Sequence, residues 1–345
     1  MNSHWHIDEG EFPAGGSPEE QYRFLLRYAI LAPSTCNTQP WKFELSDDGI
    51  AVFADYSRRM PVGDPGNREL LMSIGAAIMN LRAAAARFGL ECRVRYTFSG
   101  DSEAPLAFVS FSPSTEDHEV AAFLRTIFPG IVKRHTNRNP FLLTRIPESI
   151  LSSIRGLAEG TQVTMTISTD GRLNEQVAHL VAAADRLLLG DVGYRKESAE
   201  WVRSSWGERP DGIPGYSLGV SGVAAALAPW TTRVLDMGRI RAAKDKNLCI
   251  DAPGLVVLSS EDSVPQFLET GEVLEKLLLR ITCEGMQTSY FNLPIKSPQF
   301  RVRLRGLLGL TSWPQLLLRI GFCFSEPVAT PRRPLEEVIH SQHVH

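Results

Sequence analysis

The feature that most constrains the fold is an apolar helical pattern that occurs twice with the same glycine spacing. Gly75 precedes Gly89 by 14 residues across an alanine- and leucine-rich stretch, and Gly271 precedes Gly285 by the same 14 residues across a second apolar stretch. Strand-like sequence follows each stretch. A fixed spacing between similar elements is typical of an internal duplication. The chain is therefore expected to contain two related halves.

Helical and strand patterns alternate along the first half. Residues 18–31 predict an amphipathic helix with Ser17 as its N-cap and Pro18 at its first position. Residues 41–45 and 50–56 predict two strands around Asp47-Asp48-Gly49, which is a hairpin signal. The other elements expected in this half are a helix at 68–88, strands at 93–98 and 106–111, and a helix at 118–131.

The second half repeats part of this order around a long irregular stretch. Residues 204–230 are rich in glycine, proline and small side chains, a composition that suits a lid, a binding loop or a disordered segment. We predict a first half at 15–130 and a second half at 131–340 that contains this insertion. The elements expected in the second half are helices at 147–158, 173–190 and 270–284 and strands at 162–168, 252–260 and 316–324.

The composition is that of an ordinary globular protein. Of 345 residues, 43% are hydrophobic and 22% are charged, which is enough to bury a sizeable core. A formal net charge of -3 and a pI of about 6.3 provide no basic field for nucleic acid or anionic membranes. No apolar run approaches the ~20 residues that span a bilayer. We expect neither a nucleic-acid partner nor a membrane.

The cysteines and the N-terminus indicate a cytoplasmic protein. Five cysteines lie far apart with no CxxC pair, so the sequence predicts neither a disulfide framework nor a zinc site. The first thirteen residues carry histidine and acidic side chains and do not resemble a signal peptide.

A small polar segment, Ala32 to Trp41 (APSTCNTQPW), joins the first helix to the first strand. Its hydroxyls, amides and backbone N–H groups are suited to holding a polar ligand. A well-bonded structural turn anchored by Trp41 explains the same residues, and spacing alone does not separate the two interpretations.

Two basic segments lie about 195 residues apart. KRHTNRNP (133–140) carries three formal positive charges within six residues, and TPRRP (330–334) presents two adjacent arginines between prolines. Guanidinium groups offer paired donors that suit a phosphate or a conjugated carbonyl. Each segment alone could be a solvated surface loop. Together, in a slightly acidic chain, they suggest one anionic ligand held from two distant stretches.

These motifs together resemble the FMN-dependent nitroreductases. APSTCNTQPW resembles the Ser-x-Asn-x-Gln-Pro-Trp turn of that family, RHTNR its flavin-binding arginine motif, and TPRRP its C-terminal phosphate-binding segment. Residues 283–296 resemble the helix end and loop that lie over the flavin. The resemblance covers residues 18–340. It implies an α+β nitroreductase-like fold in which each half is a mainly antiparallel sheet flanked by helices.

The order of the motifs departs from that of single-domain members, which form dimers. Here the polar turn comes first and the arginine motif follows about 100 residues later, and neither half carries both. One complete site per chain is therefore implied, as in the fused, double-domain Acg-like branch. Because the two halves would mimic the family's homodimer, we expect a monomer.

The resemblance assigns expected roles to individual residues. Arg134, Arg332 and Arg333 would hold the FMN phosphate, Thr136 the ribityl or phosphate region, and Arg138 the pyrimidine edge. His135, between two arginines, is expected to have a lowered pKa and to position its neighbours. The residues expected to bind the cofactor are Pro33, Ser34, Thr35, Asn37, Gln39, Arg134, His135, Thr136, Arg138, Pro294, Ile295, Lys296, Arg332 and Arg333.

Two functions are compatible with this assignment. The first is an oxidoreductase in which NAD(P)H reduces FMN, and the flavin then reduces a nitro compound or quinone by ping-pong hydride transfer. The second is a protein that stores or sequesters FMN under the 204–230 lid. Neither requires a catalytic side chain or a metal, because the flavin performs the chemistry.

Overall fold

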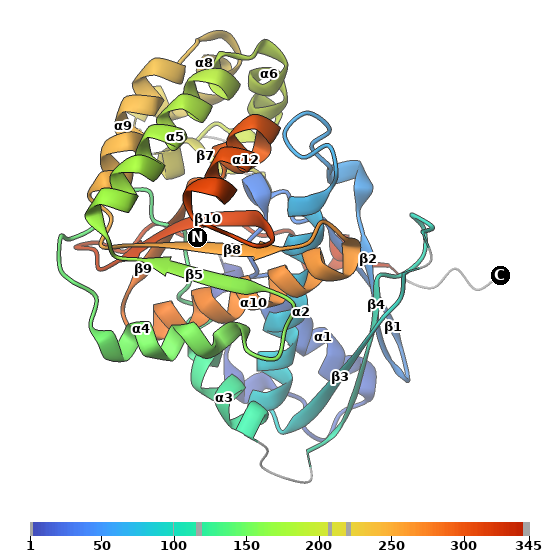
Figure 1. Cartoon of the computed structure of the whole chain (residues 1–345). Helices are drawn as coiled ribbons and strands as arrows, with labels where there is room; N and C mark the ends of the chain where they lie inside the picture. Colours follow the sequence, from blue (N-terminus) through green and yellow to red (C-terminus); the bar gives the residue numbers. More distant parts are fainter. Residues whose placement is uncertain (1–2, 99, 115–118, 206–208, 219–221, 341–345) are drawn as a thin grey trace.

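Two mainly antiparallel sheets organise the protein (Figure 1). The computed structural model describes residues 3–98, 100–114, 119–205, 209–218 and 222–340. The strands of the two sheets are β1 (Trp41–Ser46), β2 (Gly49–Ala54), β3 (Leu90–Tyr96), β4 (Ala107–Pro113), β5 (Thr164–Ser168), β8 (Gly254–Ser260), β9 (Gln287–Tyr290), β10 (Trp313–Gly321) and β11 (Ile339–His340). A small parallel pair joins β6 (Val202–Arg203) to β7 (Ile213–Pro214). The predicted α+β class is confirmed.

Helices cover both sheets and fill the space between them (Figure 1). The first follows its sequence signals, because Ser17 and Glu20 form a capping box and Pro18 occupies its first turn. The helices are α1 (Pro18–Ala29), α2 (Arg68–Arg87), α3 (Glu119–Ile127), α4 (Glu148–Arg155), α5 (Gly171–Gly190), α6 (Val192–Glu200), α7 (Gly222–Ala226), α8 (Ala228–Val234), α9 (Gly238–Ile250), α10 (Val264–Cys283), α11 (Leu293–Lys296), α12 (Pro298–Leu307) and α13 (Leu335–Val338).

The two sheets repeat one topology. In the first sheet the strand order is β11-β1-β2-β4-β3, and in the second it is β5-β8-β10-β9. Removing β11 leaves the same arrangement, in which the third strand of each half lies at the edge and the fourth lies inside it. An apolar 20-residue helix, α2 or α10, connects the second and third strands in each case.

The predicted repeat of glycines marks the point where α2 and α10 pack together. A Cβ atom at Gly75 would lie 2.0 Å from the carbonyl oxygen of Leu268, and one at Gly271 would lie 2.0 Å from that of Met72. The two contacts are reciprocal, since each glycine meets the carbonyl three residues before the other. Glycine is therefore required in both helices, because any side chain would push the backbones apart.

The halves differ most in how their first two strands are joined. The β1–β2 hairpin turns within Asp47-Asp48-Gly49, whereas α5 to α9 and the β6–β7 pair lie between β5 and β8. The predicted insertion at 204–230 is thus the middle of a longer insertion that begins at α5 and ends with α9. Residues 206–208 and 219–221 of the predicted lid lie outside the described residues.

This insertion packs on one face of the second sheet. Leu255, Val257 and Leu317 point toward α5, α9 and α12 and form a separate core with them. The alternating residues Val256 and Leu258 belong to the main core on the other face. Because both faces are covered, every residue of β8 is buried.

The α2 helix corrects one expectation from the sequence. Its length and its mean hydropathy of 1.2 would allow it to cross a membrane, so an apolar run of this size does exist. However, 94% of that stretch is buried inside the protein, where it packs against α10 and α1. It is the central helix of the main core.

Two chain segments connect the halves. Thr136 forms a parallel bridge with Thr288 of β9. The C-terminal strand β11 pairs with β1 of the first sheet. The RHTNR segment therefore extends from the first half onto the second sheet. The TPRRP segment extends in the opposite direction, so both basic motifs lie between the halves.

Candidate functional site

A cavity of about 1100 Å³ lies where the two halves and the insertion meet. The polar turn of the first half, the 134–139 segment and the 326–332 segment form its polar wall. Helices α5 to α9 form much of the opposite wall. Ten of the residues predicted to bind a cofactor line it: Pro33, Ser34, Thr35, Asn37, Arg134, His135, Thr136, Arg138, Lys296 and Arg332.

The polar turn is held in an uncommon backbone conformation. Cys36, Asn37 and Gln39 have φ angles of 50°, 55° and 52°, a left-handed region that residues other than glycine rarely adopt. The Ser34 hydroxyl accepts a hydrogen bond from the Gln39 backbone N–H at 2.9 Å and closes the turn. Strained backbone of this kind is concentrated at functional sites and persists only where surrounding contacts fix it.

Those contacts come from the side chains of Asn37 and Gln39. The Asn37 amide donates to the carbonyls of Gly212 and Pro331, at 3.0 and 3.1 Å. Gln39 donates to the Pro210 carbonyl at 2.8 Å and accepts from the Arg333 backbone N–H at 2.8 Å. Both residues therefore join the turn to the insertion and to the C-terminal segment.

Arg134 and Arg332 converge although 198 positions separate them in the chain. Both donate to the carbonyl of Leu31 at the end of α1, at 3.1 and 3.0 Å. Arg332 also donates to the Asn37 side-chain oxygen at 3.0 Å. Both guanidinium groups are buried, and the Nε atom of each has no hydrogen-bond partner among the residues that the structure describes. Two cations at one point of a cavity wall form a site for an anion.

One carboxyl group, that of Glu275 on α10, lies beside this pair. Its Oε1 atom is 3.7 Å from Arg134 Nε, and the residue is fully buried. In the described ranges neither of its carboxyl oxygens has a hydrogen-bond partner. Burial raises the pKa of Glu275 to about 7, while Arg134 and Arg332 act in the opposite direction. With at most one negative charge against two positive ones, the cluster keeps a net positive charge.

An N-terminal residue that the sequence did not indicate, Trp5, completes the cluster. Its ring lies 4.7 Å from the Arg332 guanidinium and 4.3 Å from the His135 ring, and its indole N–H donates to the Thr330 carbonyl at 2.8 Å. Burial, followed by the charges of Arg134 and Arg332, lowers the pKa of His135 to about 3. The direction is the one expected from the sequence, although burial contributes more to it than the arginines do, and His135 adds no charge near neutral pH.

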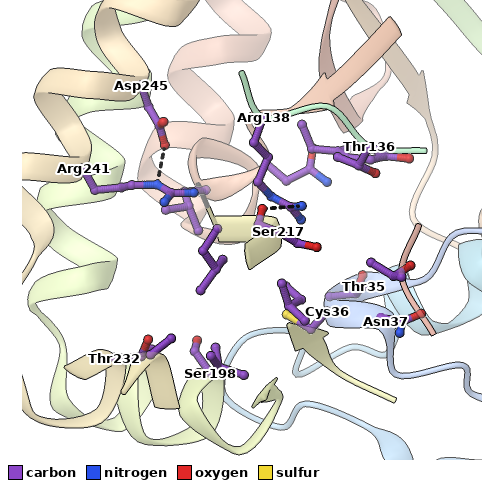
Figure 2. A pocket seen from close by; sticks show the side chains of 18 of the residues that line it. Thr35, Cys36, Asn37, Thr136, Arg138, Ser198, Ser217, Thr232, Arg241 and Asp245 are labelled. Carbon is purple, nitrogen blue, oxygen red and sulfur yellow. Dashed lines mark hydrogen bonds and ion pairs between the residues drawn. The ribbon is translucent and has the colours of Figure 1, made fainter. Parts of the chain in front are cut away.

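Arg138 brings a third cation into the cavity, further from the first two. Figure 2 shows its side chain between the Thr35–Asn37 turn and the insertion, where it donates to the Ser217 carbonyl at 3.2 Å. Burial, followed by the charge of Arg241, lowers its pKa. No carboxylate of the described residues lies within ion-pair distance of Arg138. The Arg241–Asp245 pair of α9, at 3.1 Å, faces it across the cavity (Figure 2).

Lys296 reaches the cavity as part of a buried ionic network. Its Nζ atom lies 2.6 Å from Glu69 and 2.9 Å from the Gly63 carbonyl, and Glu69 also accepts from the Thr35 hydroxyl at 2.7 Å. Nearby Glu69 raises the pKa of Lys296 against the effect of burial. The ammonium group is thus charged and occupied by protein partners.

Four of the predicted cofactor residues do not line the cavity: Gln39, Pro294, Ile295 and Arg333. Arg333 lies on the far side of its segment, 3.3 Å from Glu337 and 3.9 Å from Asp55. The Pro294 and Ile295 side chains are buried, whereas their neighbours Leu293 and Lys296 line the cavity. In an extended chain, successive side chains point in opposite directions, which explains why Arg332 and Arg333 separate.

The sequence also missed how the insertion is fastened to the first half. Glu197 on α6 accepts from the backbone N–H groups of Val62 and Gly63, at 2.7 and 2.6 Å. Asp211 pairs with Arg58 at 2.5 Å and Arg203 at 2.9 Å. The Arg58–Asp211 pair joins positions 153 residues apart, so no local sequence pattern predicts it.

Comparisons with known proteins agree with the resemblance that the motifs indicate. No family model matches the chain. It is 29% identical over 323 residues to the Mycobacterium tuberculosis protein named "Putative NAD(P)H nitroreductase acg", covering 91% of this chain and 94% of that one. A second protein of that organism, "Putative NAD(P)H nitroreductase Rv3131", is 25% identical over 326 residues, covering 93% and 91%.

Among solved structures, the FMN and NADPH-dependent nitroreductase NfnB from sphigopyxis sp. strain HMH aligns with 63% of this chain and 98% of its own, with a TM-score of 0.43 and 21% identity. The predicted similarity to nitroreductase-like proteins is therefore confirmed by the two curated relatives, which match this chain along nearly all of its length.

Proposed function

We propose that the chain is an FMN-binding oxidoreductase of the nitroreductase type, with one site per chain. The observation that carries the proposal is the convergence of Arg134 and Arg332, from segments that cross between the halves, on one wall of a deep cavity. Relatives named NAD(P)H nitroreductases support the same class of chemistry.

The phosphate of FMN would lie against Arg134 and Arg332. A phosphate dianion is costly to remove from water unless charge-assisted donors replace its hydration. Both guanidinium groups are buried, and within the described part of the chain the Nε–H of each has no hydrogen-bond partner. The neutral His135 and the Trp5 ring exclude water from the same corner. Arg333, which we expected to join them, is excluded from this role by its contacts with Glu337 and Asp55.

Arg138 would lie at the pyrimidine edge, and the Pro33–Asn37 turn would close the site from the first half. Among the described residues Arg138 has one hydrogen bond, to the Ser217 carbonyl, so donors remain for a ligand. Thr136, fixed by its bridge to Thr288, would contact the ribityl or phosphate region. FMN, when bound, accepts a hydride from NAD(P)H and passes it to an acceptor, and a cation near N1–C2=O favours its reduced anion.

The partners follow from this chemistry. NAD(P)H would be the electron donor, and a nitro compound or quinone the small aromatic acceptor, each using the cavity in turn. The two halves already pack through α2 and α10. We therefore propose a monomer that functions in the cytoplasm.

A test of the proposal is anaerobic reduction of the purified protein. We expect a yellow 1:1 complex with FMN that NADPH or NADH reduces rapidly and that a nitroaromatic then reoxidises. Flavin that dithionite reduces but pyridine nucleotides do not would favour the sequestering function instead. A protein that retains no FMN would contradict both.

A further inference from the structure

The insertion lines the cavity with a continuous apolar row. Val223, Leu227, Thr231 and Leu235 all line the cavity and follow one another at intervals of four residues. Leu227 lies at the break between α7 and α8, where its N–H donates to the Val223 carbonyl and its own carbonyl accepts from the Thr231 N–H. We call these four cavity-lining residues the mouth row.

The apolar members of this row are also exposed to solvent. Val223 is 64% exposed, Leu227 49% and Leu235 41%, and the nearby cavity-lining residues Met237 and Ile240 are 41% and 65% exposed. Side chains that line a cavity and also face solvent must lie at its opening. Single exposed apolar residues are ordinary, but a contiguous group at a cavity mouth indicates a binding surface.

A second row, of small side chains, lies beside the mouth row. Ala224, Ala228 and Thr232 each follow a mouth-row residue directly in the chain and line the cavity. Small side chains beside larger ones leave a shallow groove along the row, because the larger side chains project further. Thr232 and Ser198 of α6 lie together at the end of the cavity away from Arg241 and Asp245 (Figure 2).

The size of the cavity allows more than one ligand group. Its volume of about 1100 Å³ exceeds the roughly 300–1,000 Å³ that is usual for sites holding one drug-sized molecule. Its two regions also differ in chemistry. Arginines line the wall that we assign to FMN, whereas aliphatic residues and threonines line the mouth.

We propose that the groove formed by α7 and α8 binds the linear apolar chain of an amphiphilic aromatic acceptor. The redox-active ring of that acceptor would lie in the polar region, and its chain would leave the cavity along the mouth row. This inference rests on the proposed oxidoreductase function and narrows its substrate class. NAD(P)H does not fit the groove, because its charged and hydroxylated groups would lose water without gaining hydrogen bonds there.

Two nitroarenes with the same ring test the proposal, 4-nitroanisole and 4-hexyloxynitrobenzene. We expect the hexyl ether to bind at least tenfold more tightly, since each fully buried methylene strengthens binding by roughly fourfold. Dissociation constants are measured by equilibrium dialysis on FMN-free and FMN-loaded protein, and KM is measured with NADPH. Equal affinities for the two ethers would overturn the proposal.

Adjacent residues of α8 provide a matched pair of variants. Leu235 lines the cavity, whereas Val234, 51% exposed, does not, so both can be changed to serine without disturbing the core. Leu235→Ser should reduce the preference for the hexyl ether at least threefold, and Val234→Ser should leave it unchanged. Both variants should retain FMN, and Val234→Ser, which lies outside the cavity lining, should reduce 4-nitroanisole as the unmodified protein does.

The remaining outcomes are distinct. Equal effects of the two variants, together with a dimer that both of them dissociate, would assign the exposed patch to an interface between copies and overturn the proposal. A chain preference that persists in protein unable to retain FMN would support the groove while contradicting the proposed flavin function.

Discussion

The two halves of the molecule share a frame and differ in one connection. In the first half, β1 and β2 are joined by a tight turn, whereas in the second half the equivalent strands β5 and β8 are separated by the insertion. The shared elements form the sheets and the α2–α10 crossing. The insertion, which has no counterpart, forms the wall of the cavity opposite the polar turn.

This difference separates stability from ligand binding. Gly75, in the repeated frame, lies where α2 meets the backbone of Leu268 and Glu272 on α10. Residues outside the repeat, such as Arg332 and Asp185, line the cavity. Changes in the frame should therefore affect the whole fold, whereas changes outside it should affect ligand binding or local stability.

The largest effect is expected at the crossing of α2 and α10. In Gly75→Ala the new methyl group would meet the Leu268 carbonyl, so the helices must separate. We expect a loss of about 3 kcal/mol or more in the free energy of unfolding, measured in urea, and a similar loss for Gly271→Ala. Gly306→Ala in α12, where the space is open, should instead stabilise by about 0.5–1 kcal/mol. Unequal losses at Gly75 and Gly271 would argue against equivalent halves.

The second prediction compares the two adjacent arginines of the C-terminal segment. Arg332 lines the cavity and Arg333 does not, so Arg332→Ala should weaken FMN binding by about 2–5 kcal/mol and Arg333→Ala by less than about 1 kcal/mol. Affinities are measured by fluorescence titration of free FMN. Thermal unfolding of both apo variants controls for loss of fold. Equal weakening would show that the phosphate is not held where we propose.

The comparison also shows how far the sequence could predict this molecule. The motifs located most of the polar wall because the family resemblance identified them as a set. The motifs did not show which of their residues line the cavity and which connect distant segments. Asn37 and Gln39 do the latter, because their side-chain amides donate to the carbonyls of Gly212 and Pro210. Only the folded chain shows that Gln39 faces the Pro210 carbonyl and not the cavity.

The missed residues lacked a local signal. Trp5 lies in an N-terminal stretch without periodicity, and α9 has few buried side chains, so its pattern does not indicate a helix that packs on a sheet. Glu275 did leave a signal, because it is a charged residue within an apolar helix. A charged residue at such a position indicates an oppositely charged partner in the folded protein, although the sequence does not show that this partner is Arg134.

The third prediction concerns the carboxyl group of Asp185, which lies in the insertion and has no counterpart in the first half. Asp185 on α5 is 1% exposed, and its Oδ2 atom has no hydrogen-bond partner in the part of the chain that the structure describes. Burial, followed by the charge of Asp245, raises the pKa of Asp185 to about 8. The folded protein therefore holds a proton that the unfolded chain releases near pH 4. The contribution of the protonated Asp185 to the free energy of unfolding is complete below about pH 4 and is lost as the pH rises toward 8.

Replacing this group should remove that dependence on pH. An amide in Asp185→Asn keeps a hydrogen-bond donor for Asp245 and cannot ionise, so we expect the decline in stability between pH 5 and 8 to flatten by at most about 1.4 kcal/mol per pH unit. Asp251→Asn, an exposed carboxyl at the end of α9, is the control and should leave the slope unchanged. If the unmodified protein, Asp185→Asn and Asp251→Asn lose stability with pH at the same rate, Asp185 is ionised in the native state and the prediction is wrong.

The smallest effect is expected where the insertion is fastened to the first half. Glu197 accepts hydrogen bonds from the backbone of Val62 and Gly63 with its two oxygens. In Glu197→Gln one acceptor becomes a donor and leaves a buried N–H unpaired, so we expect a loss of about 1–2 kcal/mol. Because the bonds lie at the edge of the insertion, that loss should be local.

Amide hydrogen exchange distinguishes this local effect from a global one. Exchange should accelerate in α6 and in residues 209–214 but remain unchanged in α2 and α10, and FMN should dissociate a few times faster from the variant. Glu200→Gln, an exposed position at the end of the same helix, should change neither measurement. Faster exchange in α2 would mean that the insertion and the repeated frame unfold together, and the separation between stability and ligand binding would not hold.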